Sequence, residues 1–236
     1  MKPDMRSTTA TTSIATRPAR RIGHRRALMA TTALVAALSF VAVPALAQTW
    51  DGGGADADWG TGLNWSANAV PAAGGTAIVN GAGGSNADPT VSSNTNNLAA
   101  ANISGGTVTV DATLNAVAVT VSGTGTLTVS ATGEVRGSST PTDTTLNADD
   151  DGIVNNNGTI TGALILGGGT VNNAGVVTGA TSVNSGTLNL DPGTNLADSQ
   201  GLTVNGGTVN VNASDTVGTF SGTGGTVDID GGQTLT

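Results

Sequence analysis

The 236-residue chain contains no cysteine and no tyrosine, and most of its other reactive side chains lie in the first 47 positions. After Ala47 there is no lysine, histidine or methionine, and Arg136 is the single base. Residues 48–236 therefore have no thiolate nucleophile, imidazole base, Schiff-base lysine or zinc site of the usual nitrogen and sulfur kind. Without disulfides, their stability has to come from backbone pairing and packing.

Basic residues are equally scarce in residues 48–236, where fifteen Asp and Glu accompany one Arg and give a net charge of −14. A surface this acidic does not neutralise phosphates. We therefore expect no nucleic-acid partner.

The first 47 residues have the order of a bacterial secretory signal peptide. Residues 1–26 are basic and polar, residues 27–43 form an uncharged apolar run, and Ala45-Leu46-Ala47 is a small-x-small cleavage site. A membrane-spanning helix is the alternative, because the apolar run approaches spanning length. Arg25-Arg26 also resembles a twin-arginine export motif, so the general secretory route and the twin-arginine route both stay open.

A repeated pattern occupies much of residues 48–236. Gly-Thr followed by an aliphatic residue recurs seven times, with the aliphatic residue at Val108, Leu127, Ile160, Val171, Leu188, Val209 and Val227. The next residue is small and polar, and the one after it is apolar in five of the seven copies. This alternation is typical of a strand with one buried face. The threonines are spaced by 19, 33, 11, 17, 21 and 18 residues, and the 33 and 11 together equal two longer repeats.

A second apolar run precedes several glycine corners, as in Val119-Thr120-Val121 before Ser122-Gly123. Each unit therefore indicates a strand, a corner, a strand and a loop. Asn-Gly between apolar runs is also a hairpin signal, so an antiparallel meander is the alternative fold. Leu, Ile, Val and Phe number only 39 among residues 48–236, which leaves disorder as a further alternative. Recurrence near 18–20 residues favours an all-β solenoid of stacked parallel coils.

The segment after the cleavage site contains Trp50-Asp51-Gly52-Gly53, Trp59 and Asn64-Trp65, and then Val70-Pro71 and Ala77-Ile78-Val79. It resembles the start of passenger domains of bacterial autotransporters, the type V secretion family. The stretches Asn155–Gly162 and Leu202–Val209 resemble that family's β-helix coils. The resemblance implies a right-handed parallel β-helix displayed on a Gram-negative cell.

The same resemblance implies an outer-membrane β-barrel translocator as a partner. The family's C-terminal barrel has no counterpart before Thr236. The resemblance therefore implies a chain that continues further, a barrel on another chain, or a passenger that is released.

Three tryptophans, Trp50, Trp59 and Trp65, lie within 16 positions of one another. One interpretation is a platform on which sugar rings stack. We expect instead a hydrophobic plug over the first coil, because the terminal repeats of a solenoid need their open ends covered.

Asn147, Asp149 and Asp151, followed by Gly152, match the first half of a calcium-binding loop. The bidentate acid expected at the twelfth position is Gly158, and no flanking helix is indicated. We therefore expect a solvated acidic turn and no metal ligand, with weak calcium binding as the alternative.

Catalytic residues and cofactors are not expected. Arg136 is the single base available for a polysaccharide lyase, and the adjacent Asp149, Asp150 and Asp151 are what any acidic turn contains. Thr-x-Thr pairs at 107/109, 126/128 and 159/161 suit an ice-binding face, but Asn or Asp replaces the second Thr in the other four units.

These observations predict a signal peptide in residues 1–47, a Trp-containing cap with the first strands in 48–98, and solenoid repeats in 99–236 that are incomplete at the C-terminus. The expected function is that of a non-catalytic, exported cell-surface passenger or adhesin-like structural protein with an acidic repeat surface. Its ligand would lie on a host or neighbouring cell. The alternatives are a carbohydrate-active or calcium-stabilised secreted β-helix, or a truncated chain with no independent role.

We predict that export cleaves the chain after Ala47, because Ala45-x-Ala47 ends the apolar run. N-terminal sequencing of the exported product should begin at Gln48. A product that retains Arg25 and Arg26 would contradict the signal peptide and favour a membrane anchor.

Overall fold

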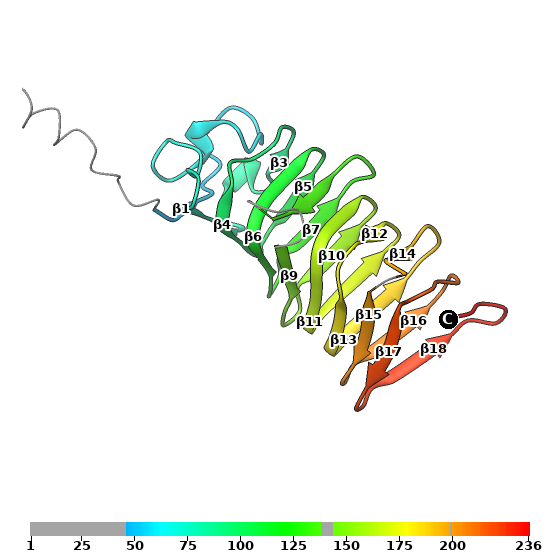
Figure 1. The fold of residues 1–236 in the computed structure, drawn as a ribbon. Helices are drawn as coiled ribbons and strands as arrows, with labels where there is room; N and C mark the ends of the chain where they lie inside the picture. The colour runs from blue at the N-terminus through cyan, green and yellow to red at the C-terminus, as the bar shows by residue number, and fades with distance from the viewer. Residues whose placement is uncertain (1–45, 138–143, 199) are drawn as a thin grey trace, which may run out of the picture. The chain divides into compact units, whose positions relative to one another are not determined.

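Short parallel strands stack coil upon coil along the described chain (Figure 1). The computed structural model describes residues 46–137, 144–198 and 200–236. The predicted signal peptide, apart from Leu46 and Ala47, lies outside these residues. About seven turns form an all-β solenoid, which confirms the fold class expected from the repeat.

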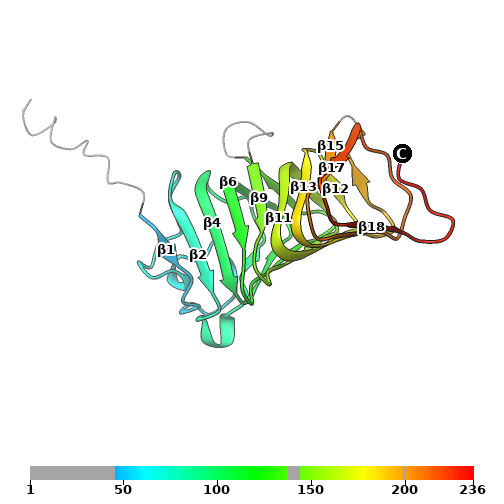
Figure 2. The ribbon, with the colours of Figure 1, turned by 90° about the horizontal axis from the view of Figure 1, so that it is seen from below.

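Each coil has up to three sides, and the first side is the longest continuous row of strands (Figure 2). This first face contains β1 (Gln48–Thr49), β2 (Thr76–Asn80), β4 (Leu98–Gly105), β6 (Thr113–Val121), β9 (Thr144–Ala148), β11 (Thr159–Asn173), β13 (Thr181–Leu190), β15 (Gly201–Val204) and β17 (Thr219–Gly222).

We call the second side the Thr/Asn face, after the side chains that it turns outward. It contains β3 (Thr90–Val91), β5 (Thr107–Val110), β7 (Thr126–Val129), β10 (Ile153–Asn156), the later halves of β11 and β13, β16 (Thr208–Val211) and β18 (Thr226–Ile229).

The third side is narrow. It contains the first residues of β6 and β11 together with β8 (Glu134–Arg136), β12 (Val176–Val177) and β14 (Asn195–Leu196). The sequence pattern predicted a loop here, whereas the structure has short parallel strands. Two short 3-10 helices, η2 (Gly62–Asn64) and η3 (Gly84–Asn86), lie near the N-terminal end.

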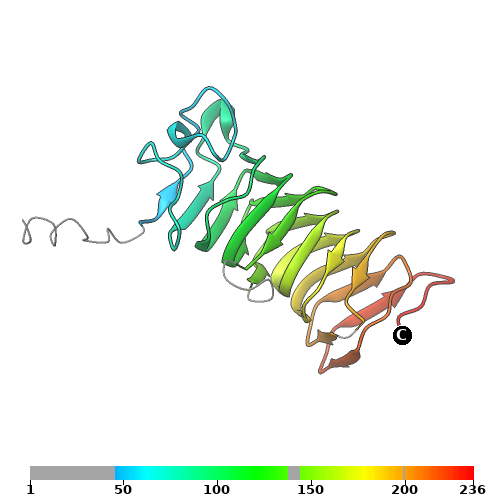
Figure 3. The same ribbon diagram turned by 45° about the horizontal axis from the view of Figure 1, so that its top comes forward.

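Every pairing between these strands is parallel, so the antiparallel meander is wrong. Parallel neighbours align equivalent positions of successive repeats, and the chain then rises by one strand spacing per coil (Figure 3). The alternating pattern therefore places most inward side chains on the same kind of side chain in the coil before.

The register corrects one part of the predicted repeat. Thr126 of β7 pairs with Ile153 of β10, which in turn pairs with Thr170 of β11. Thr159 instead pairs with Glu134 on the third face, so its Gly-Thr motif does not begin a strand of the Thr/Asn face. The 44 residues between Thr126 and Thr170 are two coils, as the spacing indicated, but the division falls at Ile153. The Gly-Thr motif at Thr159 predicted the wrong face because glycine occurs at more than one corner of each coil.

Aliphatic side chains fill the interior behind the Thr/Asn face. Val108, Leu127, Val154, Val171, Leu188 and Val209 align in register and are fully buried. Complete burial of such a side chain contributes about 1.5–3 kcal/mol to folding. Val and Leu are therefore sufficient for this thin core, and the low apolar content does not prevent an ordered arrangement.

Two asparagines interrupt the neighbouring inward column, where the pattern predicts apolar residues. Asn156 and Asn173 are fully buried and lie in register with Val129 and Leu190. Asn156 Nδ2 donates to Asn173 Oδ1 at 2.7 Å, and Asn173 Nδ2 donates to Thr194 Oγ1 at 2.5 Å. Asn173 Nδ2 also lies 3.2 Å from the Gly175 carbonyl oxygen. These bonds tie three successive coils together inside the core.

We predict that Asn173→Ala lowers the free energy of unfolding by about 2–3 kcal/mol, because it leaves buried polar groups without their partner. The matched control is Asn172→Ala, one residue earlier on the outer surface, where water can replace the lost bonds and the cost should stay below about 1 kcal/mol. Urea unfolding of both variants measures the difference. Equal losses would contradict a special role for the buried amide.

Candidate functional site

The outer surface of the Thr/Asn face consists of two parallel columns of side chains. The first column is Thr107, Thr126, Ile153, Thr170, Thr187, Thr208 and Thr226, and the second is Thr109, Thr128, Asn155, Asn172, Asn189, Asn210 and Asp228. Neighbouring strands of a sheet lie about 4.8 Å apart, so between β5 and β16 hydroxyl and amide groups recur at that spacing, with Ile153 as the one apolar member of the two columns.

The four asparagines of the second column form a hydrogen-bonded ladder. The Nδ2 of each of the last three donates to the Oδ1 of the asparagine in the preceding coil, from Asn172 to Asn155 at 2.8 Å and then from Asn189 to Asn172 and from Asn210 to Asn189 at 2.7 Å. An amide has two donor hydrogens and two acceptor lone pairs. The ladder therefore orients each amide and leaves hydrogen-bonding capacity directed away from the sheet.

Charge is concentrated at the corners of the coils. Among the acidic residues that the structure describes, only Glu134 on β8 and Asp228 on β18 lie within strands. Between β5 and β16, the two outward columns of the Thr/Asn face contain no charged side chain. The expected acidic repeat surface is thus a set of acidic edges around an uncharged face.

The three tryptophans are packed against one another at the N-terminal end. Trp50 and Trp65 are fully buried and Trp59 nearly so. The ring centroids of Trp50 and Trp65 are 5.1 Å apart and those of Trp59 and Trp65 are 4.7 Å apart, both edge to face. Such rings present no open face on which a sugar could stack.

Backbone bonds attach this tryptophan cluster to the first coil. The Trp50 N–H donates to the Ile78 carbonyl of β2, and the Trp59 N–H donates to the Thr90 carbonyl of β3. Trp50 Nε1 donates to the Asn86 carbonyl and Trp65 Nε1 to the Trp59 carbonyl. The cluster therefore covers the first edges of both main faces.

Asp56 and Asn64 hold the loop of the cluster together. Asn64 is fully buried, and its Nδ2 lies 3.0 Å from the Asp56 carbonyl oxygen and 3.1 Å from that of Asp58. Hydrogen bonds from the Thr61 side chain, the Asp58 backbone and the Asn64 side chain lower the pKa of the Asp56 carboxyl. Asp56 therefore acts as a structural acceptor in this loop.

The predicted half-loop for calcium is a tight corner. The Gly152 N–H donates to the Asp149 carbonyl at 3.0 Å, and Asp150 has a positive φ of 47°. Asn147 lies on β9 of the first face, in register with Thr120, whereas the three aspartates follow that strand. Across residues 46–137, 144–198 and 200–236, no group of three or more His, Cys, Asp and Glu side chains is placed to hold a metal ion.

Arg136 lies on the third face and is already engaged there. Its Nε donates to Asn115 Oδ1 at 2.9 Å, and its Nη1 lies 3.9 Å from Glu134 Oε2. The five residues of β9 separate the third-face side of this coil from the corner at Asp149, a distance of about 17 Å. The structure does not bring Arg136 and the aspartates into one site.

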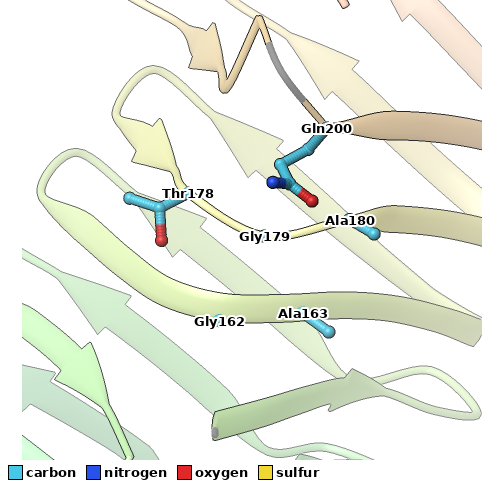
Figure 4. Close-up of a pocket in the computed structure, with 6 residues that line it drawn as sticks. All are labelled: Gly162, Ala163, Thr178, Gly179, Ala180 and Gln200. Atoms are coloured by element: carbon cyan, nitrogen blue, oxygen red, sulfur yellow. The ribbon is translucent and has the colours of Figure 1, made fainter. Parts of the chain in front are cut away.

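A shallow concavity of about 200 Å³ lies at the corner between the third and first faces (Figure 4). It is lined by Gly162, Ala163, Thr178, Gly179, Ala180 and Gln200. None of the side chains that line this notch carries a charge. It contains no acid, base or nucleophile with an activating partner.

None of the helices in the described part of the chain has the length and apolar character needed to cross a membrane. Comparisons with family models, curated proteins and solved structures found no match. The Thr/Asn face remains as the candidate site, and the sequence pattern indicates only its Thr-x-Thr pairs. Its asparagine ladder was visible in the sequence as Asn at the position after the aliphatic residue, but the pairing needed the register.

We predict that calcium changes the melting temperature only slightly, because Asn147, Asp149 and Asp151 do not converge with a closing bidentate acid. Calorimetry with Ca²⁺ or with a chelator measures the shift. A rise of many degrees that is lost in Asp151→Ala but kept in Asp191→Ala, at another corner, would show that this turn binds the ion.

Proposed function

We propose that this protein is an exported, non-catalytic β-solenoid that acts at the cell surface as an adhesin-like passenger, with the Thr/Asn face as its contact surface. The observation that carries the proposal is the uncharged, regularly spaced array of hydroxyl and amide groups along this face. Its ligand would be a neutral, polar surface on a host or neighbouring cell.

The distribution of charge supports contact through this face. Taking a charged side chain out of water costs far more free energy than taking out a hydroxyl or an amide that finds a hydrogen-bond partner. The face between β5 and β16 has no charge to desolvate, whereas the acidic corners stay hydrated and keep like molecules apart. A flat partner can therefore approach the face without burying the aspartates.

The rigidity of the array also supports the proposal. The Asn155–Asn210 ladder holds its amides in one orientation, so a partner that binds them does not have to restrict many freely rotating side chains. Contacts that are individually weak can then add along several coils. Neither the notch at Gly162 and Gly179 nor the corner at Asp149 offers a comparable arrangement.

Export and display follow from the sequence features described above. The apolar run ending at Ala47 would direct export, and the resemblance of the Trp50–Trp65 segment to autotransporter passengers implies delivery through an outer-membrane β-barrel translocator. The solenoid fold is compatible with this role. The buried tryptophans argue against the alternative of a carbohydrate-active β-helix with an aromatic platform.

We predict that Thr187→Lys weakens adherence of cells displaying the chain by tenfold or more, because it introduces a charge that contact would desolvate. Ser182→Lys is the matched control, since it adds the same charge to the same strand, β13, on the outer surface of the first face. Cell-binding assays after protease accessibility has confirmed equal surface display would compare them. Equal effects of the two changes would contradict the Thr/Asn face as the contact surface.

A further inference from the structure

Asn-Gly pairs are a reactive motif that the proposed contact surface does not use. In such a pair, the backbone nitrogen of the glycine can attack the side-chain amide carbon of the asparagine, because glycine has no Cβ atom to hinder the approach. Whether a folded protein allows this attack depends on how firmly the fold holds that nitrogen and that amide. The chain has three such pairs, Asn80-Gly81, Asn157-Gly158 and Asn205-Gly206.

The corner at Asn157 holds the glycine of its pair between coils. The Gly158 N–H donates to Asn156 Oδ1 at 3.2 Å. A Cβ atom on Gly158 would overlap the carbonyl oxygens of both Ser130 and Gly133, so backbone atoms pack closely around this residue. The Gly158 nitrogen would have to break its hydrogen bond and move away from these neighbours before it could attack.

The corner at Asn205 holds both reacting groups. Asn205 Nδ2 donates to Asn184 Oδ1 at 3.0 Å, and the Thr223 hydroxyl donates to Asn205 Oδ1 at 3.3 Å. The Gly206 N–H donates to the Val183 carbonyl oxygen at 3.3 Å. The amide and the attacking nitrogen are therefore both engaged by the preceding coil.

The corner at Asn80 differs from the other two. Asn80 ends β2, and both Asn80 and Gly81 are exposed. In the part of the chain that the structure describes, neither the Gly81 N–H nor Asn80 Nδ2 donates a hydrogen bond. Gly81 has a positive φ of 77°, and no atom would come closer than 3.2 Å to a Cβ atom placed on it. The attacking nitrogen is thus free and has room to move.

One hydrogen bond at this corner favours the reaction. The Ala82 N–H donates to Asn80 Oδ1 at 3.1 Å. This bond closes a ring around the Gly81 peptide unit and turns the side-chain carbonyl toward the backbone that follows it. A donor on Oδ1 also stabilises the negative charge that develops on this oxygen when a nucleophile attacks the amide carbon.

We propose that Asn80 is a site of spontaneous deamidation in the folded protein, whereas the fold protects Asn157 and Asn205. The Gly81 nitrogen gives up its proton to solvent base and forms a bond to Asn80 Cγ. The Cγ–Nδ2 bond breaks, and the nitrogen leaves as ammonia after it takes up a proton from water. A water molecule then opens the cyclic imide at either carbonyl, which gives aspartate or isoaspartate.

The modification acts on the loop that supports the tryptophan cluster. Asn86 lies in the loop that begins at Asn80, and its carbonyl oxygen accepts the hydrogen bond from Trp50 Nε1. Both products add a negative charge at the start of this loop. Isoaspartate also lengthens the main chain by one carbon atom there, which alters the path from β2 to the cluster.

The test compares the three sites within the same full-length chain, folded and in urea. Asn80 and Asn205 are a matched pair, because each follows valine and precedes glycine. The protein is kept at mildly alkaline pH, and mass spectrometry of its peptides measures the replacement of the amide NH₂ by OH at each site. Chromatography separates the aspartate from the isoaspartate peptides.

We expect similar rates at all three sites in urea. Folding should change the rate at Asn80 little, whereas it should slow Asn157 and Asn205 by roughly tenfold or more, because each glycine nitrogen there must first lose a hydrogen bond. Asn80→Gln should remove the fast reaction of the folded protein. Slowing at Asn80 equal to that at Asn205 would overturn the proposal, and so would a fast reaction that persists in Asn80→Gln.

Discussion

The close stacking of backbone on backbone between successive coils is the constraint on which the rest of this structure depends. One place where it is close is the corner between the first face and the Thr/Asn face, where Gly152, Gly169 and Gly186 lie above one another. A Cβ atom on Gly169 would lie 2.3 Å from the Gly152 carbonyl oxygen, and one on Gly186 would lie 2.1 Å from the Gly169 carbonyl oxygen. Only glycine leaves room for the chain at these points, so the glycine content that looks like a sign of disorder is what allows the coils to meet.

Once the coils are in contact, the side chains sort into columns. Inward columns combine Val, Leu and Ile, while outward columns place Thr on Thr and Asn on Asn, because each coil repeats the pattern of the coil before it. Hydrogen bonds between equal side chains become possible only for groups that both donate and accept, which suits asparagine and excludes aspartate and lysine. The aspartates are therefore found mainly at corners, where they face water, and the uncharged face between them is the surface that we propose for contact with another cell.

Buried and exposed asparagines are adjacent in the sequence, and they form two separate sets of hydrogen bonds between coils. Asn155 and Asn172 point outward and form part of the ladder, whereas the next residues, Asn156 and Asn173, point inward and link coils within the core. The inner pair gives up apolar contact for a polar chain that ends on Thr194. Because a shift of one residue would exchange the inner and outer sets, this arrangement favours a single register in coils whose Val and Thr positions resemble one another closely.

Much of the fold could be predicted from the sequence alone. The strands and their buried faces follow from period-two alternation and β-branched residues, and the solenoid follows from glycine corners spaced by about one coil. Because Cys, His and Lys are absent after Ala47, the sequence also excludes thiolate, imidazole and Schiff-base chemistry there. The tertiary structure alone decided four features. They are the start of a new coil at Ile153 between Thr126 and Thr170, the short strands of the third face, the buried Asn156–Asn173 pair and the uncharged columns of the Thr/Asn face. Each of these depends on which residue of one coil lies over which residue of the next, and that register is a long-range relationship that local pattern does not contain.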